Sequence, residues 1–256
     1  MRAIRRNKTR KSTFLSINFP LAVGVLFVVS TASIQAQNNG KVSIQPVQTQ
    51  EEQTMFFPVK EGTVTVYAQK DEKGKIISYS RQTIKNVEGS GKNMTINYLF
   101  ENLDKDKKIL TETPCKMIIK NNVMILDMKQ FFAGQVKDQQ IEVEITGIPM
   151  ELPTNMQPGQ VLKDAEISMS MNMGFTKLKT DVKMTEGKCL AIENVTVAAG
   201  TFKCHKITQT ITTTVMNRNI QAQVVSWYAP NIGVVKTETY DDKGKLQSLT
   251  ELVEIK

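Results

Sequence analysis

Cys204 and His205 are adjacent residues whose side chains could do chemistry, because a thiol beside an imidazole can form a nucleophile–base pair or bind a metal ion. They lie in a run that alternates like a β-strand, where neighbouring side chains point to opposite faces of the sheet. The imidazole therefore cannot reach the thiol, and the two cannot share one metal ion without a bulge. His205 is the only histidine of the chain, so it has no second imidazole for a familiar zinc site. We expect a solvent-facing His205, no metal site and no cofactor.

Other catalytic signals are absent from the sequence. It contains no glycine-rich phosphate-binding loop and no Gly-x-Ser-x-Gly elbow. Its 25 acidic residues are scattered, with no pair marked out by spacing. The sequence therefore predicts a protein that is not an enzyme, and an enzyme built on scattered carboxylates is the alternative.

The clearest pattern in the chain runs from Ile167 to Phe175, where every odd position is large and apolar and every even position is small or polar. Such a strand has one apolar face, and sheets usually bury one face, so a core strand is the favoured interpretation. Methionine side chains are also adaptable enough to accept acyl chains or a partner segment, and they are soft ligands for Cu(I). If the face binds a ligand, the predicted ligand-binding residues are Met169, Met171, Met173 and Phe175.

A segment broken by prolines precedes this strand. Pro149 and Pro153 are expected to keep it off the hydrogen-bonded ladder, so that it crosses an end or a face of the sheet. Its apolar residues Met150, Leu152 and Met156 predict either a plug for the core, which we favour, or a lid over an apolar cavity.

The first 36 residues have the order of a signal peptide. Six basic residues up to Lys11 precede an apolar stretch from Phe14 to Val29, and small and polar residues lead to Ala36. We expect cleavage between Ala36 and Gln37. An uncleaved anchor is the alternative, but the apolar run is shorter than the ~20 residues of a membrane span. The residue directly after the cleavage site is Gln37 rather than a cysteine, so lipoprotein-type lipidation lacks its acceptor.

The net charge of +8 belongs to this leader. Without the six basic residues of the leader, 27 of the 33 lysines and arginines remain beside 25 acidic residues, and no basic cluster is left. A nucleic-acid partner is therefore not expected, because such binding needs clustered Lys and Arg against the phosphates. The mature chain is predicted to be periplasmic or secreted, with no transmembrane segment after cleavage.

The remaining chain predicts a flexible linker over residues 37–54 and an antiparallel β domain over 55–256. About a dozen short alternating runs are separated by turn residues, which indicates an antiparallel meander, curved or barrel-like, and only Lys129 to Lys137 suggests a helix. Asn121 and Asn122 fit the positive φ of a tight hairpin turn. Asp71–Lys75 and Asp241–Lys245 are two copies of one turn type, a weak sign of internal duplication.

Three cysteines, Cys115, Cys189 and Cys204, follow the leader. An oxidising compartment favours one disulfide, and three small buried side chains are the alternative. The sequence does not fix the pairing. A tight hairpin at Ala198–Gly200 would pair Cys189 with a residue near Gln209, leaving it about 16 Å from Cys204 at ~3.3 Å per residue.

Several stretches resemble a family of uncharacterised exported envelope proteins, the TapB-like and DUF3108-like group. The resemblance lies in residues 152–165, 195–207, 227–235 and 238–245, and together these span most of residues 55–256. It implies one strongly curved antiparallel sheet, a half-barrel similar to the periplasmic lipoprotein carriers. It also implies that Cys115 and Cys204 are the recurring cysteines of the family, which makes them the preferred disulfide.

We therefore expect a non-enzymatic periplasmic binding or assembly protein. Its concave apolar face would be presented to a lipid, a lipoprotein or a peptide. A scaffold component of an envelope protein complex is the alternative.

Overall fold

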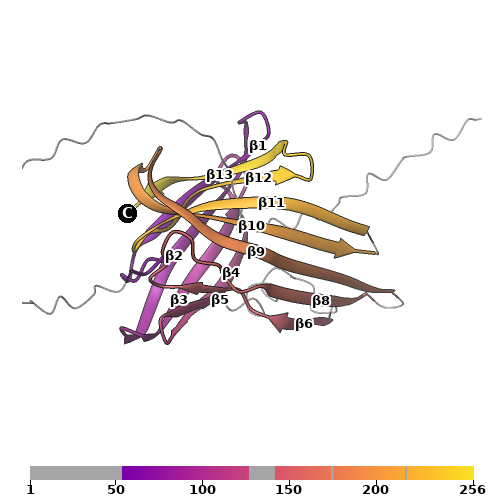
Figure 1. Cartoon of the computed structure of the whole chain (residues 1–256), viewed down its shortest axis with the longest axis horizontal. Helices are drawn as coiled ribbons and strands as arrows, with labels where there is room; N and C mark the ends of the chain where they lie inside the picture. Colours follow the sequence, from indigo (N-terminus) through magenta and orange to yellow (C-terminus); the bar gives the residue numbers. More distant parts are fainter. Residues whose placement is uncertain (1–53, 127–141, 174–175, 217) are drawn as a thin grey trace, which may run out of the picture.

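The protein forms one antiparallel sheet of thirteen strands (Figure 1). The structure is a computed structural model, and it describes residues 54–126, 142–173, 176–216 and 218–256. The strands are β1 (Val64–Asp71), β2 (Ile76–Ser90), β3 (Asn93–Leu103), β4 (Ile109–Lys120), β5 (Val123–Leu126), β6 (Glu142–Ile148), β7 (Glu151–Pro153), β8 (Ala165–Met173), β9 (Thr176–Val197), β10 (Gly200–Val215), β11 (Arg218–Ala229), β12 (Gly233–Asp241) and β13 (Leu246–Ile255).

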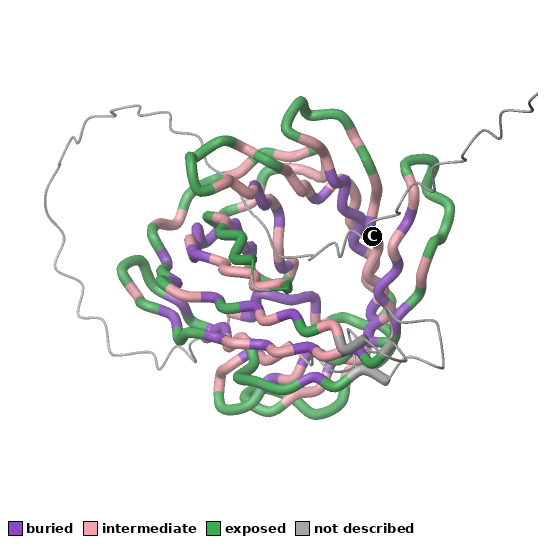
Figure 2. The backbone as a smooth tube through the Cα atoms, turned by 90° about the vertical axis from the view of Figure 1, so that its right-hand side faces the viewer, coloured by how far each residue is buried: buried purple, intermediate pink, exposed green. Residues whose placement is uncertain are grey.

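The order across the sheet is β6-β8-β9-β10-β11-β12-β13-β1-β2-β3-β4-β5-β7. Nine of the twelve neighbouring pairs are consecutive strands, and β13 pairs with β1 to join the last strand to the first. Strands β6 and β7 form opposite edges of the sheet although only Pro149 and Met150 separate them. The two edges therefore converge, and Figure 2 shows the strands curling around a common interior. This confirms the predicted curved antiparallel sheet, which is not closed into a barrel.

Irregularities in strand pairing accompany this curvature. The register shifts between Val66 and Tyr67 in β1, between Ile84 and Asn86 in β2, and twice between Lys206 and Thr210 in β10. An extra residue on one strand bends that strand and increases its twist. The long strands β9 and β10 can therefore wrap around the interior instead of remaining flat.

Three of the hairpins use one turn design. In the β1–β2 turn the Asp71 carboxylate accepts hydrogen bonds from the backbone amides of Lys73 at 3.0 Å and Lys75 at 2.9 Å. Asp241 repeats both bonds in the β12–β13 turn, with the same two distances. Asp104 does the same in the β3–β4 turn, where Lys107 takes the position of the turn glycine at φ 63°. The sequence pattern missed this third copy because it lacks the glycine.

The Asn121–Asn122 hairpin is confirmed. The two residues have φ values of 51° and 66°, and they join β4 to β5. Positive φ at both central residues matches the twist of the flanking strands, and Asn tolerates it better than most residues.

Apolar side chains gather on both faces of the sheet. The larger cluster fills the concave interior, and a smaller one lies on the outer face around Trp227, Val225 and Cys204. Partly buried Val195, Val197 and Phe202, from the end of the β9–β10 hairpin, pack against this outer cluster. The hairpin therefore shields part of the convex face, as Figure 1 indicates at the left end of β9.

Three predictions lie outside the described residues: the leader over 1–36, the linker apart from Thr54, and the short helix over 129–137. Within the described ranges, no helix has the length and apolar character needed to cross a membrane.

Candidate functional site

The concave face is the candidate functional site, because alternation along each strand directs large apolar side chains toward it. Tyr98 and Phe100 of β3 face inward, and their cross-strand neighbours on β4 include Cys115. Ile167, Met169 and Met171 of β8 join the same buried cluster from the other side of the interior. Period-two alternation on two distant parts of one curved sheet thus builds a single apolar interior.

A segment outside the sheet occupies part of this interior. Met55, Phe56 and Phe57 precede β1, and all three side chains are buried. The Phe56 ring meets His205 edge-on at 4.7 Å between centroids, and the Phe57 ring lies 5.1 Å from Tyr98. We call residues 55–57 the plug segment.

Few polar contacts hold the plug segment. The Asn231 amide donates to the Met55 carbonyl at 2.6 Å, and the Phe56 amide donates to the Met124 sulfur at 3.3 Å. Just before it, the Thr54 amide donates to Asn155 Oδ1 at 3.0 Å. The plug segment belongs to no strand, so apolar packing is the main interaction that keeps it in place.

The proline segment also contributes to the interior. Met156 is fully buried, and Leu152 and Leu162 are buried beside it in the same cluster. This agrees with a plug for the core. The expectation that the prolines keep the whole segment off the ladder is wrong, because Glu151–Pro153 pairs with β5 as β7. Proline is tolerated there because β7 is an edge strand that needs no donor from Pro153.

A cavity of about 90 Å³ remains beneath the plug segment. Its apolar wall includes Phe56, Phe57 and residues of β3 to β5, and its polar wall consists of uncharged side chains from β1 and β2. The described residues that line it are Phe56, Phe57, Tyr67, Gln69, Ser80, Gln82, Tyr98, Phe100, Met117, Met124, Leu126, Met150, Leu152, Tyr228, Gly233 and Val234. Pockets for small-molecule ligands usually measure roughly 300–1,000 Å³, so the cavity as it stands is too small for one.

Tyr67, Tyr228 and His205 of the interior are shifted toward their neutral forms. Burial raises the pKa of Tyr67 to about 12 and also raises the pKa of Tyr228, because a phenolate would lose its hydration. Burial lowers the pKa of His205, and the nearby Lys203 lowers it further, while hydrogen bonds to backbone groups of Met156 and Tyr228 oppose the shift. The interior therefore disfavours charge of either sign.

His205 does not face solvent as expected. It is 8% exposed, it pairs across the ladder with Tyr228, and it packs against the plug segment. Strand alternation separated it correctly from Cys204, but it could not show which of the two faces was covered. Its Nδ1 atom is buried without a hydrogen-bond partner in the structure.

The methionine strand lies where the alternation placed it. Met169 and Met171 are buried on the inner face, beside Ile167. Met173 ends β8, but its side chain and the whole of Phe175 lie outside the described residues. The packing makes Met169 and Met171 core residues of the interior, and ligand binding by all four stays a prediction.

The predicted disulfide is wrong. Cys115, Cys189 and Cys204 are all described, and no disulfide joins them. Cys115 points into the concave interior, whereas Cys204 points to the outer cluster beside Trp227, so the sheet itself separates them. Cys189 pairs with Ile207 rather than near Gln209, in part because Leu190 is an extra residue on β9 at the register shift, and it faces inward, away from Cys204.

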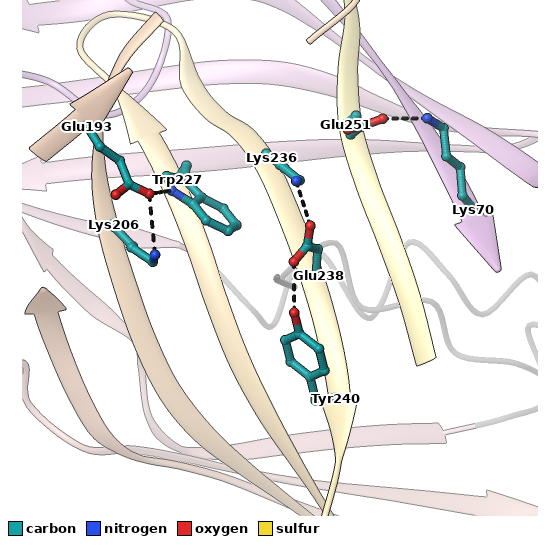
Figure 3. A network of polar contacts seen from close by, with 8 residues as sticks. All are labelled: Lys70, Glu193, Lys206, Trp227, Lys236, Glu238, Tyr240 and Glu251. Carbon is teal, nitrogen blue, oxygen red and sulfur yellow. Dashed lines mark hydrogen bonds and ion pairs between the residues drawn. The ribbon is translucent and has the colours of Figure 1, made fainter. Parts of the chain in front are cut away.

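The outer face carries an ordered polar network that sequence reasoning missed (Figure 3). Lys206, Trp227 and Lys236 are successive cross-strand partners on β10, β11 and β12. The two ammonium groups lie 5.2 and 5.3 Å from the centroid of the indole ring, within the range of cation–π attraction. Glu193 accepts the indole N–H at 2.6 Å and lies 3.4 Å from Lys206 Nζ.

This network continues along the neighbouring strands. Lys236 Nζ lies 2.6 Å from Glu238, whose other oxygen accepts the Tyr240 hydroxyl at 2.9 Å. Glu251 forms an ion pair with Lys70. Every one of these charges has an opposite charge beside it, which identifies the network as a support for the buried Trp227. Lys206, Trp227 and Lys236 lie on three different strands, so no local sequence pattern marked the network.

A second cavity of about 550 Å³ lies on the outer face of β13 and β1 to β4. Arg81 and Glu101 form a bidentate ion pair on its wall, and Glu101 is only 3% exposed. Lys85, Lys107, Glu112, Glu254 and Lys256 line it as well, so both signs of charge are present. The charges of this cavity therefore favour neither anionic nor cationic ligands.

Comparison with known proteins gives the family. The family model described as DUF3108-like matches residues 60–252, so the chain belongs to the DUF3108-like family. A comparison with curated proteins gave no match.

Two solved structures share the fold. One is a protein from Bacteroides fragilis, described as exported and of YmcC-like fold, with a TM-score of 0.65 and 21% identity over 79% of this chain and 99% of its own. The other is a protein from Parabacteroides distasonis, described as a lipoprotein, with a TM-score of 0.66 and 26% identity over 80% and 100%. Both descriptions agree with the export predicted from the leader.

Proposed function

We propose that this exported envelope protein binds an apolar ligand on its concave face, such as a lipid, the acyl chains of a lipoprotein or an apolar peptide. The plug segment occupies the site while no ligand is bound. The observation that carries this proposal is that two phenylalanines from outside the sheet form one wall of the interior cavity.

Displacement of the plug segment is physically reasonable because it breaks no strand pairing. The loss is confined to apolar burial and the hydrogen bonds made by the backbone near Met55 and Phe56. A fully buried Phe side chain contributes roughly 1.5–3 kcal/mol, and an incoming alkyl chain would restore burial of the same kind. The space vacated by Phe56 and Phe57 would be continuous with the cavity beneath them.

The first experiment is native mass spectrometry of the mature protein purified from its own host. We expect a co-purifying lipid or apolar peptide. The scaffold alternative predicts none, because a scaffold needs a filled core and exposed contact surfaces only.

The second experiment measures plug displacement directly by hydrogen exchange. Saturating the intact protein with N-phenyl-1-naphthylamine, a neutral apolar dye, should speed amide exchange at residues 55–57 while leaving the central amides of β3 unchanged. The variant Phe56→Ala/Phe57→Ala should bind the dye more tightly, and Phe202→Ala on the outer cluster is the control. Absence of saturable dye binding, together with the absence of a co-purified ligand, would rule out this function.

A further inference from the structure

The cavity under the plug segment has two chemically different walls. Tyr67 and Ser80 are direct cross-strand partners on β1 and β2, and Gln82 lies two residues further along β2. With Gln69 they form the polar wall, opposite an apolar wall that includes Phe57 and Met124. We call these four residues, Tyr67, Gln69, Ser80 and Gln82, the polar wall.

None of the described residues that line this cavity is charged. The basic side chains nearest in the ladder lie on the other face of the sheet: Lys70 pairs with Glu251, and Arg81 pairs with Glu101. The inward-facing Thr237 and Ser226 are also neutral, with 3.5 Å between their hydroxyl oxygens. Among the described residues that line the cavity, an anion would therefore meet hydroxyl and amide groups but no cation.

We propose that the concave site selects an uncharged amphiphile, an alkyl or acyl chain that ends in an amide, ester or hydroxyl group, over the corresponding carboxylate. This inference rests on the proposed function, because it names the class of ligand for the same site. The chain would replace the plug segment against the apolar wall, and the polar end would hydrogen-bond to the polar wall.

The physical reason is the difference between burying a neutral polar group and burying an ion. A neutral amide or hydroxyl exchanges its hydrogen bonds with water for bonds to Gln, Ser and Tyr side chains at small net cost. A carboxylate without a cationic partner loses its hydration with nothing comparable in return. The raised pKa of Tyr67 and the lowered pKa of His205 report the same preference for neutral groups.

The test compares two ligands that differ only at the head group. Dodecanamide and dodecanoate compete for the site against N-phenyl-1-naphthylamine at about pH 8, where a free carboxyl group is ionised. We expect the amide to displace the dye at a concentration at least about tenfold lower than the carboxylate. In the variant Gln82→Leu this preference should fall, whereas Gln223→Leu, at an exposed position on the outer face of β11, should leave it unchanged.

The outcomes separate the two proposals. Equal displacement by both ligands would show that the head group stays in water, which overturns this inference and leaves the proposed function standing. A preference for the carboxylate, or a preference for the amide that survives Gln82→Leu, would also overturn it. If the dye binds but neither ligand displaces it, this inference fails, whereas the proposed function fails only if saturable dye binding and a co-purified ligand are both absent.

Discussion

The three cysteine side chains are buried at separate places, two on the inner face and one on the outer face. Burial raises the pKa of Cys204 to about 12, with Glu193 adding to the shift, and burial also raises the pKa of Cys189. Since the thiolate is the reactive form, these two groups should be inert in the folded protein.

A thiol titration checks this. The folded protein should react slowly with Ellman's reagent, and all three thiols should react after denaturation. Non-reducing peptide mapping of exported protein is the companion measurement. A disulfide between Cys115 and Cys204 would contradict the structure, because the two side chains point to opposite faces of the sheet.

His205 predicts a pH dependence of stability. Its pKa is lower in the folded protein than the ordinary value near 6.5, so the folded state binds its proton less well than the unfolded state. The contribution of His205 is therefore complete above about pH 6.5 and is lost as the pH falls toward the folded pKa. We expect the drop in Tm between neutral and mildly acidic pH to shrink in the variant His205→Phe, which keeps a ring against Phe56. An unchanged drop would assign the acid sensitivity to other groups.

At the scale of elements, β8 directs apolar side chains to the interior and polar side chains to the outer face of the sheet. Met171 is 9% exposed on the inner face, whereas Ser170 is half-buried on the outer face opposite Lys179. Met171→Glu would bury a carboxylate without a partner, and we expect a loss of roughly 3 kcal/mol or a failure to fold.

The matched variant Ser170→Glu places the same side chain on the other face. Its effect should stay within about 0.5 kcal/mol, as for most surface substitutions. Urea denaturation of both variants measures the difference. A stable Met171→Glu protein would show that this part of the interior admits water.

The three Asp turns allow a second test at this scale. Gly244 has φ 75°, and a Cβ there would meet nothing within 4 Å, so Gly244→Ala changes backbone strain alone. We expect it to destabilise by about 1 kcal/mol. In the matching turn, Lys107 already bears this strain at φ 63°, so Lys107→Gly should cost less than Gly244→Ala or should stabilise the protein. Thermal denaturation measures the change in stability of both variants. An equal loss of stability in both would contradict the strain argument.

At the scale of the whole molecule, the two edges of the sheet meet through the two-residue link between β6 and β7. This convergence encloses an interior that one flat sheet of the same strands would not have. Segments distant in sequence come into contact only because the sheet curls, as Phe56 does with His205 and Phe57 with Tyr98.

Export is also a property of the whole chain. The mature protein should begin at Gln37, because the basic, apolar and small-residue regions of the leader end at Ala36. N-terminal sequencing of protein from the native host measures this directly. Recovery of chains starting at Met1 in the membrane fraction would favour the uncleaved anchor.

The sequence by itself determined the local features of this protein. Alternation placed Met169 and Met171 on one face of a strand, and the asparagine pair located the β4–β5 hairpin. These features depend on neighbours within a few residues, where side-chain direction alternates strictly and turn residues permit only certain backbone angles. The strand pattern and turn signals predicted an antiparallel meander, curved or barrel-like, and the resemblance to a family implied one strongly curved sheet.

Only the tertiary structure decided what covers each face. Cys204 and His205 are separated by alternation, but both are buried, because the β9–β10 hairpin packs against one face and the plug segment against the other. From the sequence, the plug segment was assigned to the β domain together with the strands that follow it. Met55, Phe56 and Phe57 show no alternation that would set them apart. Their burial depends on contacts with β3, β10 and β11, and contacts between residues so far apart follow from the curvature of the whole sheet rather than from any local pattern.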